Sequence, residues 1–312
     1  MLQIGIDFGG TKIEAAALDQ DGRFLARMRT PNPGDYDRAV RDVCGLVGRV
    51  EAELGCLGTV GLGTPGSTDP RTGLMRNANS TYLNGRPFHQ DIEAALGREV
   101  RLANDANCLA LSEAVDGAAA GARTTFAVIV GTGVGGGLVV DGRIVEGSNG
   151  IGGEWGHVPL PWMTIEEYPG PACWCGHHGC LDMLVSGTGL RKDHAARTGL
   201  MLDGEQIVSA AREGEPAAVA SLDRYVSRLG RAMAMVVNII DPEVFVMGGG
   251  MSNVAEIYPA LPAVIAAHAF GGAWQGRISA ARWGDSSGVR GAARLWARPA
   301  PGSAGDFPHA PV

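Results

Sequence analysis

Long apolar runs, lysine and excess positive charge are all scarce in this sequence. No uninterrupted apolar stretch of about 18 residues occurs, so no membrane span is expected. Acidic side chains outnumber basic ones, 33 against 26, which gives a formal net charge of −7. A chain with this balance has no general attraction for a phosphate backbone, so we expect no nucleic-acid partner. Lysine occurs only at Lys12 and Lys192.

The rest of the composition is that of a globular protein. The 312 residues suffice for one large domain or two ordinary ones, and 45% are hydrophobic against 19% charged. Glycine is abundant, with 48 residues, but it follows no three-residue period, which excludes collagen. The first residues turn acidic and glycine-rich too soon for a signal peptide, so a cytoplasmic location is expected.

Two similar segments organise the chain. Strands predicted over residues 2–8, 13–18 and 24–30 form a β-meander with a glycine turn after the first strand. Residues 125–140 repeat this strand–turn–strand pattern, which predicts a duplicated α/β unit whose halves face each other across a cleft. Apolar spacing predicts helices over residues 36–54, 88–96, 106–115, 186–197, 215–240, 254–268 and 288–297.

The same pattern gives predicted domain limits. A smaller N-terminal lobe comprises residues 1–117 and 286–298, and a larger C-terminal lobe comprises residues 118–285. Residues 299–312 are rich in proline, glycine and alanine and are expected to form a mobile tail.

The segment Asp7-Phe8-Gly9-Gly10-Thr11-Lys12 is the first candidate binding site. Its two adjacent glycines let backbone N–H groups approach an anion without a Cβ in the way. Thr11 adds a hydroxyl donor and Lys12 a positive charge, and the Asp7 carboxylate can hold a hydrated Mg²⁺ near the same anion. The alternative is an ordinary hairpin turn, which needs only one glycine.

A second glycine-rich turn is formed by Gly131-Thr132-Gly133-Val134-Gly135-Gly136-Gly137 and contains the pattern G-x-G-x-x-G. A dinucleotide-binding site would need a helix after this pattern, whereas residues 138–142 predict a strand and a turn. No Gly-Lys dipeptide occurs in the chain, which also excludes a P-loop. Two glycine hairpins can clamp a polyphosphate from both sides; the alternative is a flexible turn without a ligand.

Asn104-Asp105 lies where a predicted strand ends and a helix begins. The carboxyl ends of strands are where α/β folds place ligands, so Asp105 is a candidate general base for a hydroxyl substrate. The alternative is that it only caps the helix.

Cysteines cluster at Cys173, Cys175 and Cys180, which favours a metal site in a chain without an export signal. A closed tetrahedral zinc site needs a fourth ligand, and the candidates are His157, His177 and His178. A histidine inside the 175–180 loop would strain it, so we favour His157. A disulfide is the alternative, although a Cys-x-Cys pair is poorly shaped for one.

Taken together, these motifs resemble the ROK sugar-kinase family, from about residue 2 to about residue 297. The motifs are Asp7–Lys12, Thr64-Pro65-Gly66, Asn104-Asp105-Ala106-Asn107, the second glycine turn, Glu154-Trp155-Gly156-His157 and Cys173-Trp174-Cys175-Gly176-His177-His178-Gly179-Cys180. Within the family, residues 77–85, 100–121 and 153–163 look most like bacterial fructokinases of the manno(fructo)kinase type.

The resemblance implies an α/β chain with the two-lobed, actin-like (ribonuclease-H-like) ATPase fold, with a cleft between the lobes and a zinc-binding loop. It implies ATP, Mg²⁺ and a structural Zn²⁺ as cofactors, a hexose as substrate, and a homodimer. The implied nucleotide-binding residues are Asp7, Gly9, Gly10, Thr11, Lys12, Gly131, Thr132, Gly133, Gly135, Gly136 and Gly249. The implied sugar-binding residues are Gly66, Asn79, Asn104, Asp105, Glu154, His157 and Asp182. The implied zinc ligands are His157, Cys173, Cys175 and Cys180.

The resemblance also assigns roles and shows one departure. Asp105 would accept the proton of the attacking sugar hydroxyl, and His157 would serve both zinc and sugar. The family usually has Glu two residues after the last zinc cysteine, where it touches the sugar, but this chain has Asp182. The shorter side chain implies either a sugar about 1 Å closer or a bridging water.

The expected activity is ATP-dependent phosphorylation of a hexose on its 6-hydroxyl, with fructose as the first choice. N-acetylglucosamine, glucose and mannose are the alternatives within the same family. A sugar-responsive regulator of the same family is the alternative from a different functional class. It would need a DNA-binding segment ahead of the kinase body, and the first phosphate turn already begins at Asp7.

Overall fold

The computed structural model describes residues 2–297, so the predicted tail at 299–312 lies outside the described residues. The chain divides into two compact units. Within the described residues, one comprises residues 2–125, 137–152 and 285–297, and the other comprises Phe126–Gly136 and Gly153–Gly284. The lobe limits expected from the sequence stay a prediction.

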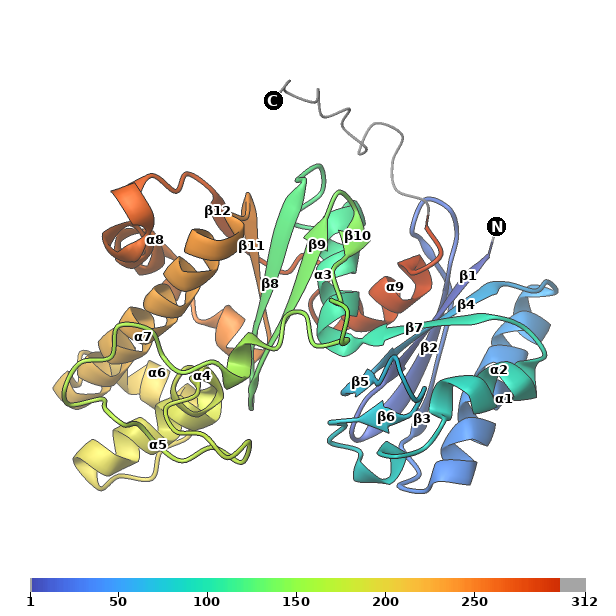
Figure 1. Cartoon of the computed structure of the whole chain (residues 1–312), viewed down its shortest axis with the longest axis horizontal. Coiled ribbons are helices and arrows are strands. Elements are labelled where there is room, and N and C mark those ends of the chain that lie inside the picture. The colour runs from blue at the N-terminus through green and yellow to red at the C-terminus, as the bar shows by residue number, and fades with distance from the viewer. Residues whose placement is uncertain (1, 298–312) are drawn as a thin grey trace. The chain divides into compact units, whose positions relative to one another are not determined.

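A five-stranded sheet forms the centre of the first unit, with the order β3-β2-β1-β4-β7 (Figure 1). Its strands are β1 (Gln3–Phe8), β2 (Lys12–Leu18), β3 (Phe24–Pro31), β4 (Thr59–Thr64) and β7 (Val100–Asn104). β1, β2 and β3 pair antiparallel, which is the meander expected from the sequence, whereas β1, β4 and β7 pair parallel. The carboxyl ends of β1, β4 and β7 therefore lie at one edge of the sheet.

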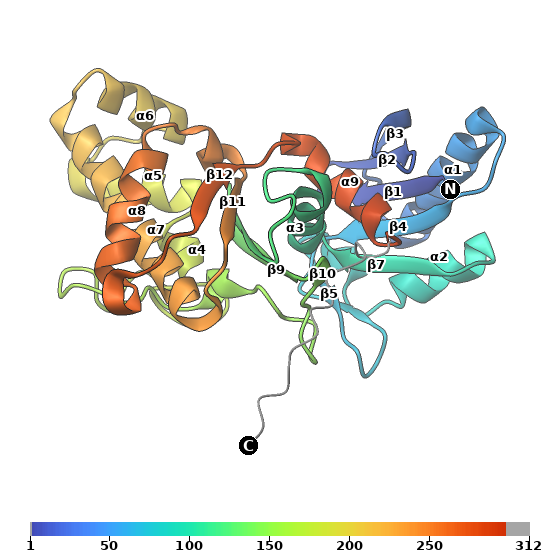
Figure 2. The ribbon, with the colours of Figure 1, turned by 90° about the horizontal axis from the view of Figure 1, so that it is seen from above.

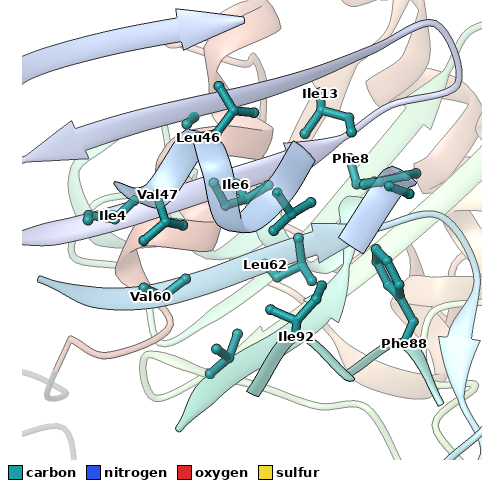
Figure 3. Close-up of a cluster of buried hydrophobic side chains, with 14 of the residues drawn as sticks. Ile4, Ile6, Phe8, Ile13, Leu46, Val47, Val60, Leu62, Phe88 and Ile92 are labelled. Atoms are coloured by element: carbon teal, nitrogen blue, oxygen red, sulfur yellow. The ribbon is translucent and has the colours of Figure 1, made fainter. Parts of the chain in front are cut away.

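Helices α1 (Tyr36–Leu54) and α2 (Phe88–Leu96) cover one face of this sheet. Figure 3 shows their apolar side chains meeting those of β1 and β4, with Leu46 and Val47 near Ile4 and Ile6, and Phe88 near Phe8. Phe8 and Phe88 pack edge to face with ring centroids 5.3 Å apart. This buried apolar cluster holds in place the strand whose end carries the first glycine turn.

Helices α3 (Asp105–Asp116) and α9 (Ser287–Arg294) lie side by side in the same unit (Figure 2), and α9 packs on β1 and β4. A Cβ on Gly61 of β4 would overlap the Ala292 carbonyl oxygen of α9, so only glycine allows this approach. Short elements β5 (Ser67–Thr68), β6 (Met75–Arg76), β10 (Arg143–Ile144) and η1 (Thr81–Leu83) complete the unit.

A second five-stranded sheet has the order β10-β9-β8-β11-β12. Its longer strands are β8 (Thr124–Val130), β9 (Val134–Val140), β11 (Val244–Gly248) and β12 (Arg277–Ala280). The second unit adds the helices α4 (Leu181–Leu184), α5 (Gly187–Thr198), α6 (Gly204–Arg212), α7 (Pro216–Ile240) and α8 (Ile257–His268), with the short turns η2 (Trp155–His157), η3 (Gly250–Asn253) and η4 (Phe270–Gly272). A last short turn, η5 (Gly284–Ser286), leads into α9.

Helix α7 is the central support of the second unit, because α5, α6 and α8 all pack against it. Arg228 and Arg231 of α7 are buried, and both form ion pairs with Glu167 at 2.8–2.9 Å. These pairs tie the long segment before the cysteine cluster to the helix. Within residues 2–297, no helix combines the length and the hydropathy that crossing a membrane requires.

Candidate functional site

The first glycine turn joins β1 to β2 and is held from one side by Asn32. Gly9 N–H donates to the Lys12 carbonyl oxygen at 2.9 Å, and the Asn32 amide donates to the Gly9 carbonyl oxygen at 2.8 Å. A Cβ on Gly10 would meet nothing within 4 Å, so the outer side of the turn is open. Sequence reasoning missed Asn32, which lies outside every motif and acts through a contact across 23 residues.

Lys12 and Asp7 place charged side chains at the two ends of the first glycine turn. The Lys12 ammonium lies 3.7 Å from the Glu14 carboxylate, which is itself only 2% exposed and also pairs with Arg29 at 2.7 Å and with Arg27. Burial first, and then the nearby carboxylates of Asp105 and Glu14, together raise the pKa of Asp7 from its ordinary 3.8 to about 6.

Asp105 begins α3 directly after β7, as expected, and its side chain is exposed. Asn104 is the N-cap residue, since its side-chain oxygen accepts from Ala106 N–H at 2.8 Å. The Asn104 amide group also donates to the Gly66 carbonyl oxygen at 3.0 Å. Asn104 therefore joins the turn after β4 to the helix that carries Asp105.

The other predicted residues of the first unit are Gly66 and Asn79. Gly66 has φ +71°, and a Cβ there would overlap the Arg76 carbonyl oxygen, so glycine is required twice over. Asn79 is exposed and follows Ala78, whose backbone N–H and carbonyl are both bound by the Asn84 side chain at 2.9 and 3.0 Å. Asn84 therefore fixes the backbone directly before Asn79, a contact that the sequence did not indicate.

The second glycine turn lies between β8 and β9 in the second unit. Trp155 Nε1 donates to the Gly135 carbonyl oxygen at 2.8 Å, and Gly187 N–H donates to the Gly131 carbonyl oxygen at 2.8 Å. The Val134 N–H donates to Asp182 Oδ1, also at 2.8 Å. Residues on both sides of the cysteine cluster in sequence therefore hold this turn.

A cavity of about 890 Å³ opens beside this turn within the second unit. Its lining comprises Gly131, Thr132, Gly187, Thr188, Arg191, Asp203, Gly204, Glu205, Val208, Arg212, Gly250, Met251, Asn253 and Val254. Predicted residues Gly131 and Thr132 thus line it, whereas predicted Gly249 does not. Gly249 has φ +80°, and a Cβ there would overlap the Val130 carbonyl oxygen. Helices α5 and α6 contribute several of these lining residues, which the sequence did not indicate.

The cysteine cluster closes around His157. One ligand atom from each of His157, Cys173, Cys175 and Cys180 lies within 4.8 Å of the others, with neither His177 nor His178 in the group. The Cys175 and Cys180 sulfurs are 3.6 Å apart, and His157 Nδ1 is 3.7 Å from the Cys173 sulfur. Ligands on a zinc tetrahedron with bonds of about 2.3 Å lie about 3.8 Å apart, so these residues fit zinc.

The cluster does not fit the disulfide alternative. All six cysteines are free thiols in the described chain, and a disulfide would need sulfurs about 2 Å apart. Burial raises the pKa of the Cys180 thiol to about 12, so without a cation this thiol is protonated at neutral pH. A bound cation would stabilise its thiolate form.

Glu154 and Asp182 complete the predicted site residues of the second unit. Glu154 is exposed and immediately precedes η2, whose last residue is His157. Asp182 is half-buried, and one of its carboxylate oxygens is bound to the second glycine turn, a contact that the spacing of the motif did not indicate. The predicted contact of Asp182 with a sugar stays a prediction.

Relatives of known name match this chain along nearly its whole length. It is 40% identical over 296 residues to the N-acetyl-D-glucosamine kinase of Photobacterium profundum, covering 93% of this chain and 98% of the relative. The N-acetyl-D-glucosamine kinase of Vibrio cholerae gives the same values.

Solved structures match the fold as well. A ROK hexokinase from Thermus thermophilus superposes with a TM-score of 0.84 at 35% identity, covering 94% of this chain and 97% of that one. A ROK family glucokinase from Streptomyces griseus, in complex with glucose and AMPPNP, has a TM-score of 0.73 at 29% identity over 95% and 99% of the two chains. The ROK family itself matches residues 3–299. These matches confirm the fold class expected from the sequence, and the chain belongs to the ROK family of sugar kinases, with its two-lobed, actin-like fold.

Proposed function

We propose that this ATP-dependent sugar kinase phosphorylates N-acetylglucosamine on its 6-hydroxyl. The observation that carries the proposal is the 40% identity, over almost the full length of both chains, to kinases named for that sugar. The sequence alone favoured fructose, on the resemblance of residues 77–85 and 153–163 to fructokinases. None of the relatives described above is named for fructose, so fructose becomes the second candidate.

The phosphate groups of ATP would lie against the two glycine turns. Support comes from the open outer side of the first turn and from the cavity of about 890 Å³ beside the second. Backbone N–H groups in such turns and the Lys12 ammonium would neutralise phosphate charge, which is most of what phosphoryl transfer requires of a protein. The proposed nucleotide-binding residues are those expected from the resemblance.

Asp105 would be the general base. Its exposed carboxylate at the start of α3 is presented by the Asn104 cap, which also fixes the Gly66 turn. A base so placed can align a sugar hydroxyl and take its proton during attack on the γ-phosphate. Gly66, Asn79, Asn104, Glu154 and His157 stay proposed sugar contacts, and the sugar contact expected of Asp182 competes with its hydrogen bond to the Val134 N–H.

Asp7 would hold Mg²⁺, which supplies charge neutralisation at the phosphates when bound. The carboxylate fits this role because burial and the neighbouring carboxylates make its negative charge unfavourable without a cation. Zinc would be structural, since three thiolates and one imidazole fill its tetrahedron and leave no position for water.

A coupled ADP-release assay across N-acetylglucosamine, fructose, mannose and glucose tests the proposal. N-acetylglucosamine should show the highest kcat/KM by at least about tenfold, because site groups matched to one substituent pattern are left unpaired by another. The phosphorus NMR spectrum of the product should show a 6-phosphate. The Asp105→Asn variant, purified identically, controls for contaminating kinases. A fructose or glucose preference of tenfold or more would overturn the substrate assignment.

Two further expectations have their own tests. The homodimer implied by the resemblance predicts a light-scattering mass twice that of one chain. The cytoplasmic location predicts that fractionated cells of the source retain the protein with soluble cytoplasmic markers.

A further inference from the structure

The second glycine turn depends on Asp182 for one of its contacts. The Val134 N–H donates to Asp182 Oδ1 at 2.8 Å. A Cβ built on Gly133 would come within 2.8 Å of the same oxygen and would meet nothing else except the Asp182 Cγ at 3.8 Å. Gly133 does not have a positive φ, so the Asp182 carboxylate is what a side chain at this position would have to displace.

Asp182 is itself held firmly. It is the second residue of α4, two positions after Cys180, which is the N-cap residue of that helix. The Ser186 hydroxyl donates to the Asp182 carbonyl oxygen at 2.6 Å, and Cys180 forms an isolated bridge with Pro159. The carboxylate is therefore presented to the turn by the end of the cysteine loop.

A turn with this composition needs such support. Gly131 and Gly133 are two of the three residues between β8 and β9, and glycine has the largest backbone freedom to lose when a ligand orders it. An ionised carboxylate that accepts from a backbone N–H makes one of the stronger hydrogen bonds in proteins. Holding the turn in one conformation before the ligand arrives lowers the entropic cost of binding.

We propose that Asp182 is a positioning residue of the nucleotide site, which preorganises the phosphate-binding turn through Val134. This rests on the proposed function, in which that turn binds ATP phosphates. It differs from the sugar-contact role expected from the family motif, where the longer Glu touches the sugar. Changes at Asp182 then act on nucleotide affinity and leave sugar affinity nearly untouched.

Asp182→Ala and Asp182→Asn separate the two roles. Asp182→Ala removes the hydrogen-bond acceptor of the Val134 N–H. Calorimetry without sugar should then show an ADP affinity about tenfold lower, which is the usual effect of losing a hydrogen bond to a charged group. The KM for ATP should rise by the same factor. The KM for the sugar should stay within about twofold. Asparagine keeps an oxygen for the Val134 N–H, so ADP affinity should return to within about threefold of the parent. Asp223→Ala, which removes an exposed carboxylate of α7 in the same unit, should change neither constant.

Gly133→Ala tests the same contact from the other side and covers the case in which Asp182→Ala does not fold. The added methyl should push the turn off Asp182 Oδ1 and weaken ADP binding about tenfold. The double variant should be no weaker than Gly133→Ala alone, because both changes break one hydrogen bond.

A rise in the sugar KM with unchanged ADP affinity in Asp182→Ala would overturn the proposal in favour of a sugar contact. Full additivity of the two changes would also overturn it. A parent enzyme that binds ADP but does not phosphorylate N-acetylglucosamine would refute the substrate assignment alone, and the ADP measurements on Asp182 would stand.

Discussion

Replacing Asp7 with asparagine should make the protein more stable at neutral pH, although the change removes a proposed functional group. In the folded chain, burial and the carboxylates of Asp105 and Glu14 together raise the pKa of Asp7 from 3.8 to about 6. The folded state thus holds the proton more tightly than the unfolded state does. Stability is lost as pH rises through this interval, because the folded chain must then carry an unfavourable charge.

The size of the effect follows from the pKa difference. Each pKa unit corresponds to about 1.4 kcal/mol, so a difference of about two units gives a cost near 3 kcal/mol once Asp7 is fully ionised. About half of this cost is already present at pH 5, and all of it above about pH 7. The asparagine side chain of the variant carries no charge at any of these pH values, so Asp7→Asn should gain up to about 3 kcal/mol over the parent at pH 8.

Urea unfolding of both proteins from pH 5 to pH 8, without Mg²⁺ or nucleotide, measures the difference directly. The free energy of unfolding of Asp7→Asn minus that of the parent should grow with pH and level off near pH 7. Asp21→Asn, at an exposed aspartate of the β2–β3 turn, is the matched control and should give a small, pH-independent difference. A gain that is flat with pH, or larger at pH 5 than at pH 8, would refute the reasoning. Kinase activity of the variant should fall at the same time, as expected for a destabilising functional residue.

The remaining predictions concern catalysis and the metal. Asp105→Asn should lower kcat about 10²–10⁴-fold with little change in sugar affinity, because the amide keeps the shape but cannot take a proton; activity within a few fold of the parent would contradict this. Lys12→Ala should raise the KM for ATP about tenfold and leave the sugar KM nearly unchanged, while Glu14 keeps Arg27 and Arg29 as partners; an equal ATP KM would mean that the lysine is not a phosphate ligand. Elemental analysis should find one zinc per chain, and chelation should lower the melting temperature and the activity together, because His157 and the cysteine loop lose their shared anchor; purified protein without zinc would refute this.

Much of the fold was predictable because its signals are local. The helix predicted over residues 36–54 is α1 (Tyr36–Leu54), and the apolar residues at helical spacing form its buried face. The helix predicted over residues 215–240 is α7 (Pro216–Ile240), which begins at a proline after a capping glutamate. Helix α6 (Gly204–Arg212) was missed, although Asp203 and Gln206 form a capping box that announces its start.

The sequence by itself determined which chemical groups are available and which neighbours along the chain present them. Glycine turns after apolar strands, the asparagine cap before Asp105, and three cysteines within eight residues are all properties of short segments, whose conformation depends mainly on backbone sterics and local hydrogen bonds.

Only the tertiary structure decided how these segments act on one another. The raised pKa of Asp7 depends on burial and on carboxylates from other elements, and the cavity beside the second turn owes its walls to α5 and α6. The spacing of Cys180 and Asp182 is the same whether that carboxylate meets a sugar or the Val134 N–H. Spacing fixes separation along the chain, whereas the direction of a side chain and its dielectric surroundings come from packing against residues far away in sequence.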